Sequence, residues 1–266
     1  MLYIHENNLK NKIDSNYNDK GKEIKEFYEE VYLKYREQLE SFDYLSEDIS
    51  VFQEAARLMD AYLIEVETFS SKMHITSQSK FRSTFIEEIS TYLFKELPLI
   101  KDNTFGIYNK NIYAGMKINN HMHIDIISKD VDFCVGKKVN LKIDNSQTIP
   151  TIIPIICVEA KTYLDATMFG EVQFSSKQIK NASPNVQTYV LMEYNEVSNE
   201  KIIAARYDNN LNEMFALRNG SRRTSTIISA PINPEALLEY YKEIRTAINN
   251  TKIDDVINNT GRLLDR

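Results

Sequence analysis

The pattern of hydrophobic and polar positions changes from a helical to a strand-like period close to Pro98. Before this point, from Lys22 to about Glu67, apolar residues recur at spacings of three and four, which predicts amphipathic helices. A third helix is expected in "SKFRSTFIEEISTYLFKEL", which ends before Pro98. Residues 1–20 are rich in Asn, Asp and Lys, and we expect them to form a loose leader.

Downstream of this change the pattern is typical of strands. Residues 123–136 and 149–161 are rich in Ile and Val and are bounded by turn residues, so each is expected to be a strand. If these two strands pair as neighbours, they form a hairpin. "GEVQFSSKQIKNAS" predicts a helix that ends at Pro184, and two further strands are expected at 186–195 and 213–218.

The order of these elements predicts an α/β fold, with a mixed central sheet flanked by helices and a helical region at the N-terminus. We expect the leader and helical region to occupy residues 1–70 and the core to occupy residues 71–266. A last helix is predicted from Glu235 to about Asn249. A chain of 266 residues, 42% of them hydrophobic, is long enough to bury a substantial core.

Charge and composition limit the possible functions. The net charge of −6 argues against a protein that coats nucleic acid without specificity, but it is compatible with a site-specific nuclease. No apolar stretch approaches the roughly 18 residues that span a bilayer, and the N-terminus lacks the apolar core of a signal peptide. We therefore expect a soluble, cytoplasmic protein with no membrane partner. Cys134 and Cys157 have no metal-ligand spacing and are predicted to be buried, reduced thiols.

The stretch "CVEAKTYLDATMF" (157–169) carries the candidate chemistry. Glu159 and Lys161 end an apolar strand and share one face of it, about 7 Å apart. If the two expected strands pair, Asp132 converges with Glu159, and two carboxylates so placed repel unless a divalent cation lies between them. A Mg²⁺ site needs only one or two carboxylates with waters and a substrate phosphate. The ammonium of Lys161 would orient a water and stabilise charge on phosphorus, so the set predicts metal-assisted phosphodiester hydrolysis.

Two further acidic positions compete for a place in this site. Asp130 shares the face of Asp132 by strand alternation, so either residue is a candidate ligand. On the preceding helix, Glu88 lies about 100° from the centre of the apolar face and Glu87 about 160°. Glu88 is therefore the candidate that reaches the site, and Glu87 is expected to point nearer to solvent.

Several segments of the chain resemble the PD-(D/E)XK nucleases, and more closely the type II restriction endonucleases of the BbvCI kind. The resemblance covers about residue 84 onward, and its most specific part is "VEAKTYLDATM". It implies a restriction-endonuclease core, Mg²⁺-dependent cleavage of double-stranded DNA and sequence-specific recognition. By position, the metal carboxylates fall on Asp132 and Glu159 and the lysine on Lys161, although Val131 replaces the family's usual proline. The other segments that carry the resemblance are "FIEEISTYLF", "KDVDFCVG", "IKNASP", "MEYN", "MFALR" and "PINPEALLEYYKEI".

The resemblance also implies partners. Cutting both DNA strands needs two active sites, and hence a homodimer or a heterodimer with a related subunit. A recognition site related to CCTNAGC and a cognate DNA methyltransferase in the same system are further implications. Two alternatives remain open: a repair or mobile-element nuclease on the same core, and an inactive DNA-binding subunit of a heterodimer.

Two basic segments are candidates for DNA contact. "ALRNGSRRTST" (216–226) follows an expected strand and brings together Arg218, Arg222 and Arg223, and arginine binds both guanine and phosphate. "KMHITSQSKFR" (72–82) precedes the helix that carries the glutamates. Its basic residues Lys80 and Arg82 are suited to phosphate contacts.

Overall fold

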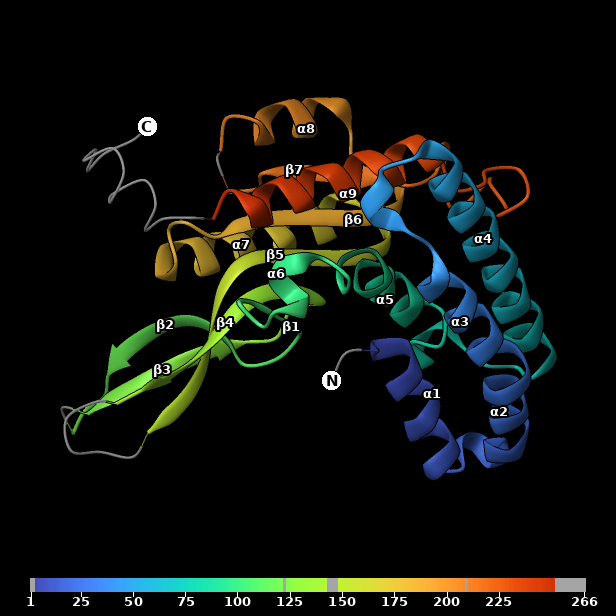
Figure 1. Ribbon diagram of the computed structural model, residues 1–266, viewed down its shortest axis with the longest axis horizontal. Helices are drawn as coiled ribbons and strands as arrows, with labels where there is room; N and C mark the ends of the chain where they lie inside the picture. Colours follow the sequence, from blue (N-terminus) through green and yellow to red (C-terminus); the bar gives the residue numbers. More distant parts are fainter. Residues whose placement is uncertain (1–2, 122, 143–147, 209, 252–266) are drawn as a thin grey trace.

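The computed structural model describes residues 3–121, 123–142, 148–208 and 210–251. Within these residues a mixed seven-stranded sheet lies at the centre, with helices on both of its faces. The N-terminal helices gather at one end of the molecule, and a long β-hairpin extends from the other (Figure 1). The predicted architecture, a mixed sheet flanked by helices with a helical N-terminal region, is confirmed.

The N-terminal region is packed from its first turn. Its helices are α1 (Ile4–Asp14), α2 (Gly21–Phe27), α3 (Leu33–Ser41) and α4 (Ile49–Lys72), with a π-helical turn at Tyr28–Tyr32 between α2 and α3. The prediction of a loose leader over residues 1–20 is wrong. Leu9 is fully buried and Ile13, one helical turn later, packs against the same hydrophobic cluster. Because most residues of this segment are polar, its composition did not indicate the short apolar stripe of Leu9 and Ile13. This stripe packs α1 against α2 and the core.

The remaining helices surround the sheet. They are α5 (Ser83–Phe94), α6 (Pro98–Lys101), α7 (Ala166–Ala182), α8 (Asn199–Ala205) and α9 (Pro234–Asn249). Asp165 caps α7 by accepting hydrogen bonds from the backbone of Thr167 and Met168, and Asn233 caps α9 in the same way. The three helices expected in this part of the chain are therefore confirmed as α5, α7 and α9, while α6 and α8 were not predicted.

Each expected strand is present, but one of them is divided in two, and the two strands between residues 106 and 118 were not predicted. They are β1 (Gly106–Tyr108), β2 (Ile112–Ile118), β3 (Ile124–Lys129), β4 (Phe133–Leu141), β5 (Ile149–Leu164), β6 (Gln187–Asn195) and β7 (Glu213–Ala216). The single strand expected at 123–136 is two strands, β3 and β4. Val131 interrupts them, because its side chain is buried and its N–H donates to the carbonyl of Asn109 at 3.1 Å. As a result β3 pairs with β2, and β4 pairs with β1 and β5.

β5 is the central strand of the sheet. It pairs antiparallel with β4, parallel with β6, and parallel with β2 through Ile112 and Ile152. The predicted pairing of the strands that contain Cys134 and Glu159 is thus confirmed. The order across the sheet is β1-β4-β5-β2-β3, and β6 followed by β7 extends from β5.

The two faces of β5 have different environments. Ile156, Val158 and Ala160 belong to a hydrophobic cluster that α4, α5 and α9 complete on one face of the sheet. Cys157 lies on the opposite face, where Cys134 and Ile179 of α7 share a second cluster. Both cysteines are buried free thiols, as predicted. Glu159 and Lys161 continue the face of Cys157 by strand alternation.

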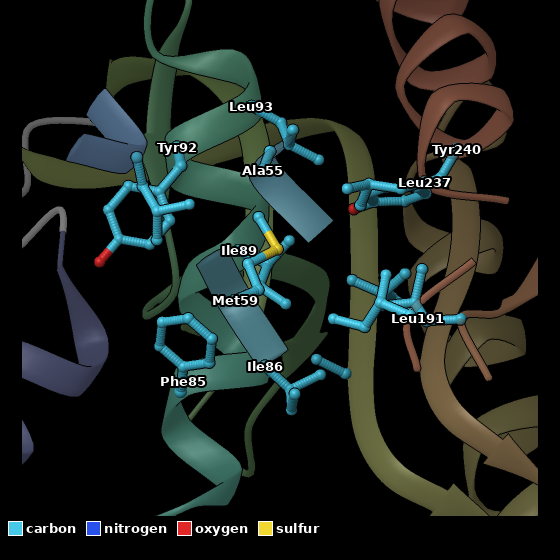
Figure 2. Packing of buried hydrophobic residues seen from close by; sticks show 14 of the residues in the cluster. Ala55, Met59, Phe85, Ile86, Ile89, Tyr92, Leu93, Leu191, Leu237 and Tyr240 are labelled. Atoms are coloured by element: carbon cyan, nitrogen blue, oxygen red, sulfur yellow. The ribbon is translucent and has the colours of Figure 1, made fainter. Parts of the chain in front are cut away.

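Helices from both expected parts of the chain share one core. Figure 2 shows Ala55 and Met59 of α4 next to Ile89 of α5, with Leu191 of β6 and Leu237 of α9 opposite. The boundary between residues 1–70 and 71–266 stays a prediction, but the two parts pack as one hydrophobic unit. Among the described helices, none has the length and apolar character that crossing a membrane requires.

Candidate active site

Asp132, Glu159 and Lys161 meet at the point where β4 begins and β5 approaches its end. The Nζ atom of Lys161 lies 3.3 Å from Oδ2 of Asp132 and 3.1 Å from Oε2 of Glu159. The same Oδ2 accepts a hydrogen bond of 2.7 Å from the backbone N–H of Ala160. The predicted convergence of these three side chains is present in the structure.

Regular strand geometry produces this convergence. Phe133 lies opposite Val158 in the β4–β5 ladder, so Asp132 falls beside the segment that carries Glu159. Glu159 and Lys161 are two residues apart and therefore share a face. On that face, α7 contributes Ser175, whose hydroxyl donates to Oε1 of Glu159 at 3.4 Å. The carboxylate of Glu159 is thus held from both sides.

The charges in this cluster shift the pKa values of Glu159 and Lys161. Burial, with the adjacent charge of Asp132, raises the pKa of Glu159, while Lys161 acts in the opposite direction. Burial alone would lower the pKa of Lys161, but the charges of Asp132 and Glu159 raise it above its usual value. Lys161 is therefore a positively charged ammonium between two carboxylates. Two oxyanion groups this close also create a binding position for a further cation.

Glu87, rather than Glu88, faces this site. Burial and then the charge of Asp132 raise the pKa of Glu87 to about 7, while Lys80 and Lys161 oppose this shift. Within α5, every residue from Thr84 to Phe94 except Glu87 is buried. Glu87 is thus the partly exposed position of this stretch, and its charge interactions with Asp132, Lys161 and Glu159 place its carboxyl group near β5.

The prediction that Glu88 reaches the site is wrong. Glu88 is fully buried, and its Oε2 accepts hydrogen bonds from the backbone N–H groups of His5 at 2.7 Å and Glu6 at 3.1 Å. Its Oε1 accepts from the hydroxyls of Tyr32, at 2.8 Å, and Tyr92. Glu88 therefore caps the first turn of α1, whose N–H groups have no partner within the helix. Sequence spacing could not show this, because the contact joins residues more than 80 positions apart.

Asp130 also lies outside the cluster. Its side chain is exposed, and its Oδ1 accepts a hydrogen bond of 3.1 Å from the backbone of Asn111. The turn at Val131 separates it from Asp132, so the two aspartates do not share a strand face as expected. Of the two alternatives, only Asp132 contacts Lys161.

The donor set suits a hard divalent cation that keeps several waters. Within the described part of the chain, no group of three or more His, Cys, Asp and Glu side chains is arranged to enclose a metal ion. Asp132 and Glu159 supply two carboxylates, which is the number that Mg²⁺ commonly takes from a protein.

The family model for the Bpu10I restriction endonuclease matches residues 78–259, which is more than half of the chain. This chain belongs to the Bpu10I restriction endonuclease family. It is therefore a type II site-specific nuclease, and its fold is of the restriction-endonuclease kind. A comparison with solved structures finds a chain of the native BbvCI A2B2 tetramer, with a TM-score of 0.75 and 17% identity, covering 94% of this chain and 97% of that one. A search of curated proteins finds no match.

Arg218 forms ion pairs in the interior of the restriction endonuclease, so the prediction that Arg218 contacts DNA is wrong. The side chain is fully buried, its Nε donates to Oε2 of Glu193 at 2.8 Å, and its Nη2 lies 2.6 Å from Oδ1 of Asp60. Arg82 belongs to the same network, with contacts of 2.8 Å to Glu193 and 3.0 Å to Glu67. Both guanidinium groups are thus committed to carboxylates of the enzyme rather than to DNA.

Three of the predicted DNA-contact residues remain on the surface of the restriction endonuclease. Lys80, Arg222 and Arg223 are exposed. The guanidinium of Arg222 lies 4.5 Å from the ring centre of Tyr163, which follows Lys161 on the same face of β5. Tyr163 therefore holds one exposed arginine at the end of β5, a contact that no local sequence pattern predicts.

Proposed function

We propose that this restriction endonuclease hydrolyses phosphodiester bonds in double-stranded DNA at a specific sequence and requires Mg²⁺. The observation that carries the proposal is the contact of Lys161 with both Asp132 and Glu159. Restriction endonucleases generally use a divalent metal, and Asp132 and Glu159 would hold it here. When bound, the metal would lower the pKa of a water and offset charge on the phosphate.

The side chains of this chain supply the remaining functions. The ammonium of Lys161 would hold the attacking water by hydrogen bonding and stabilise the negative charge that develops on the phosphate oxygens. Ser175 and the backbone N–H of Ala160 fix the two carboxylates through the hydrogen bonds described above. Glu87 would add negative charge beside Asp132 once it has lost its proton.

Exposed basic residues near the site support DNA binding. Arg222, held against Tyr163, and the neighbouring Arg223 would contact DNA next to the cleaved phosphate, and Lys80 would contact the backbone on the side of α5. A recognition sequence related to CCTNAGC remains part of the proposal. A cognate methyltransferase would protect the same sequence in the host.

Double-strand cleavage requires two active sites, so we also propose that the chain assembles with a second copy or with a related subunit. The BbvCI protein of similar fold is an A2B2 tetramer. Assembly of this chain is inferred from the chemistry of cutting two strands, and the tetramer gives it a precedent.

Digestion of a plasmid of known sequence tests the proposal. Discrete fragments are expected with Mg²⁺ and none with EDTA, and Glu159→Gln is expected to abolish cutting in Mg²⁺. A purified chain that binds DNA without cutting it would favour an inactive DNA-binding subunit. Undiminished cutting by Glu159→Gln would refute the site assignment.

Cleavage is expected to increase with pH around pH 7, because Glu87 has a pKa of about 7. Below this pH the carboxyl is protonated and neutral, and above it the group is negative and adds to the field that attracts a cation. In Glu87→Gln this increase should be lost and the rate at pH 8 should fall by roughly tenfold, which corresponds to about 1.4 kcal/mol. Initial cleavage rates from pH 6 to 8.5 measure this.

Glu88→Gln is the matched control for that experiment. Glu88 has the same chemistry and is the next residue of α5, and burial also raises its pKa to about 7. Its carboxylate caps α1 instead of facing the site, so the pH profile of cleavage should keep its shape. A profile that changes in Glu88→Gln but not in Glu87→Gln would reverse the assignment of the two glutamates.

A further inference from the structure

The hairpin formed by β2 and β3 packs against α7 through β2, and its tip extends away from the body of the molecule (Figure 1). Within the described residues, β3 pairs only with β2, so one side of its backbone has no strand partner. The other edges of the sheet are β1 and β7, of three and four residues, whereas β3 has six. Proteins commonly keep exposed edge strands short, because a long exposed edge is a template for pairing with another chain.

The hairpin also exposes apolar side chains. Met116 is 60% exposed, Ile118 is 66% exposed and Ile127 is 40% exposed. Met116 lies opposite Ile126 and Ile118 opposite Ile124, so these four side chains form a continuous apolar surface on one face of the hairpin. A two-stranded hairpin in water is only marginally stable by itself, and pairing with a further strand stabilises it.

The sequence of β3, "IDIISK" (124–129), is complementary to itself in the antiparallel direction. If two copies pair about a two-fold axis at Ile127, Asp125 of each copy lies opposite the partner's Lys129. The two opposite charges thus meet twice, once on each side of the axis. Opposite charges directly across two strands stabilise pairing, and a two-fold axis repeats each contact.

The backbone is consistent with this register. The N–H of Asn119 donates to the carbonyl of His123 at 2.9 Å, so the polar groups of His123 point toward β2. Because the direction alternates along a strand, the groups of Asp125 and Ile127 also point toward β2, and those of Ile126 and Ser128 point to the open edge. About an axis at Ile127, Ile126 lies opposite the partner's Ser128, and their outward groups form the new ladder.

We propose that β3 is a self-association surface, where it pairs antiparallel with β3 of a second copy of this chain about an axis at Ile127. The two sheets would join into one continuous sheet, with the charge pairs between Asp125 and the partner's Lys129 fixing the register. This inference rests on the proposed assembly and names the surface and the partner. It requires no change in the catalytic site.

Charge reversal tests the register with the full-length chain in the absence of DNA. Asp125→Lys places two lysines opposite each other at each pair, and Lys129→Asp places two aspartates there. Each variant alone should dissociate at least about tenfold more readily than the unmodified chain, because like charges directly opposite are destabilising. An equimolar mixture of the two variants restores opposite charges at both pairs and should form a dimer. Sedimentation velocity of each variant and of the mixture measures this.

A cysteine cross-link tests the axis independently. Residues directly opposite at a non-hydrogen-bonded position have Cα atoms about 4.5 Å apart, which is within the range that a disulfide spans. Ile127→Cys should therefore form a covalent dimer on mild oxidation. Ile203→Cys is the control, because Ile203 on α8 is 52% exposed and lies outside β3. Cys134 and Cys157 are buried, so they should not interfere.

The possible outcomes distinguish a failure of the β3 proposal from a failure of the proposed nuclease activity. An unmodified chain that is monomeric, or that associates only with a different subunit, overturns self-association through β3, whether or not it cuts DNA. A dimer that persists in both charge variants, with no cross-link at Ile127→Cys, overturns the choice of β3. A β3 dimer that does not cut DNA would instead contradict the proposed activity and leave the surface standing.

Discussion

Replacing Lys161 with methionine is expected to reduce DNA cleavage by about 10³-fold, within the range found when a preorganised charge or a proton-transfer group is removed. Methionine keeps much of the aliphatic volume but has no ammonium between Asp132 and Glu159. The water that Lys161 would hold loses its donor, and charge developing on the phosphate loses its nearest cation on the protein. Single-turnover cleavage at saturating Mg²⁺ and enzyme measures the chemical step.

The loss should be specific to the chemical step. DNA affinity of Lys161→Met, measured by fluorescence anisotropy, should fall by no more than a few-fold, because one cation among several phosphate contacts is removed. Lys201→Met is the matched control, since Lys201 is exposed on α8, and it should cleave at the unmodified rate. Cleavage by Lys161→Met within tenfold of the unmodified rate would exclude a central role for the ammonium.

The cluster of Asp132, Glu159 and Lys161 could be predicted from the sequence, because the features that place these residues together are mostly local. Glu159 and Lys161 are two residues apart, and strand alternation alone places them on one face. Asp132 required one further assumption, that its strand pairs with theirs, and the β4–β5 ladder confirms it. The resemblance of "VEAKTYLDATM" to a nuclease family agreed with this geometry. Short-range pattern and one strand pairing were thus sufficient for the central three residues.

The glutamates of α5 could not be assigned from the sequence, because a helical wheel assumes a single buried face. The structure buries α5 on almost all sides: the sheet and α9 contact it on one side and α1 on another. The buried position of Glu88 depends on α1, which was expected to be a loose leader. An error about residues 1–20 therefore led directly to an error about the site.

The roles of the arginines in the basic segment 216–226 could not be assigned from the sequence either. Arg218 and Arg222 are four positions apart in one loop, and nothing local distinguishes them. Arg218 is buried because Asp60 of α4 and Glu193 of β6 approach it from distant parts of the chain. Composition predicts that such a loop is basic, but only tertiary packing determines which guanidinium faces the protein and which faces solvent.

Arg218→Met is expected to destabilise the fold by about 3–5 kcal/mol, the cost of removing one partner from a buried ion pair. Among the described residues, the fully buried Glu193 would keep Arg82 as its ion-pair partner, and Asp60 would lose the guanidinium of Arg218. For a chain of this length such a loss lowers the melting temperature by roughly 6–20 °C. Thermal unfolding followed by circular dichroism measures this change.

Arg222→Met is expected to have the opposite effect to Arg218→Met: it should weaken DNA binding without destabilising the fold. Arg222 is exposed and contacts the protein mainly through the ring of Tyr163. Its loss should leave the melting temperature nearly unchanged and weaken DNA binding by about 1–3 kcal/mol, roughly 5- to 150-fold. Arg218→Met, measured at a temperature where it remains folded, should bind DNA with nearly unmodified affinity. If instead Arg218→Met kept its melting temperature but lost DNA binding, Arg218 would serve DNA contact rather than the buried ion pairs with Asp60 and Glu193.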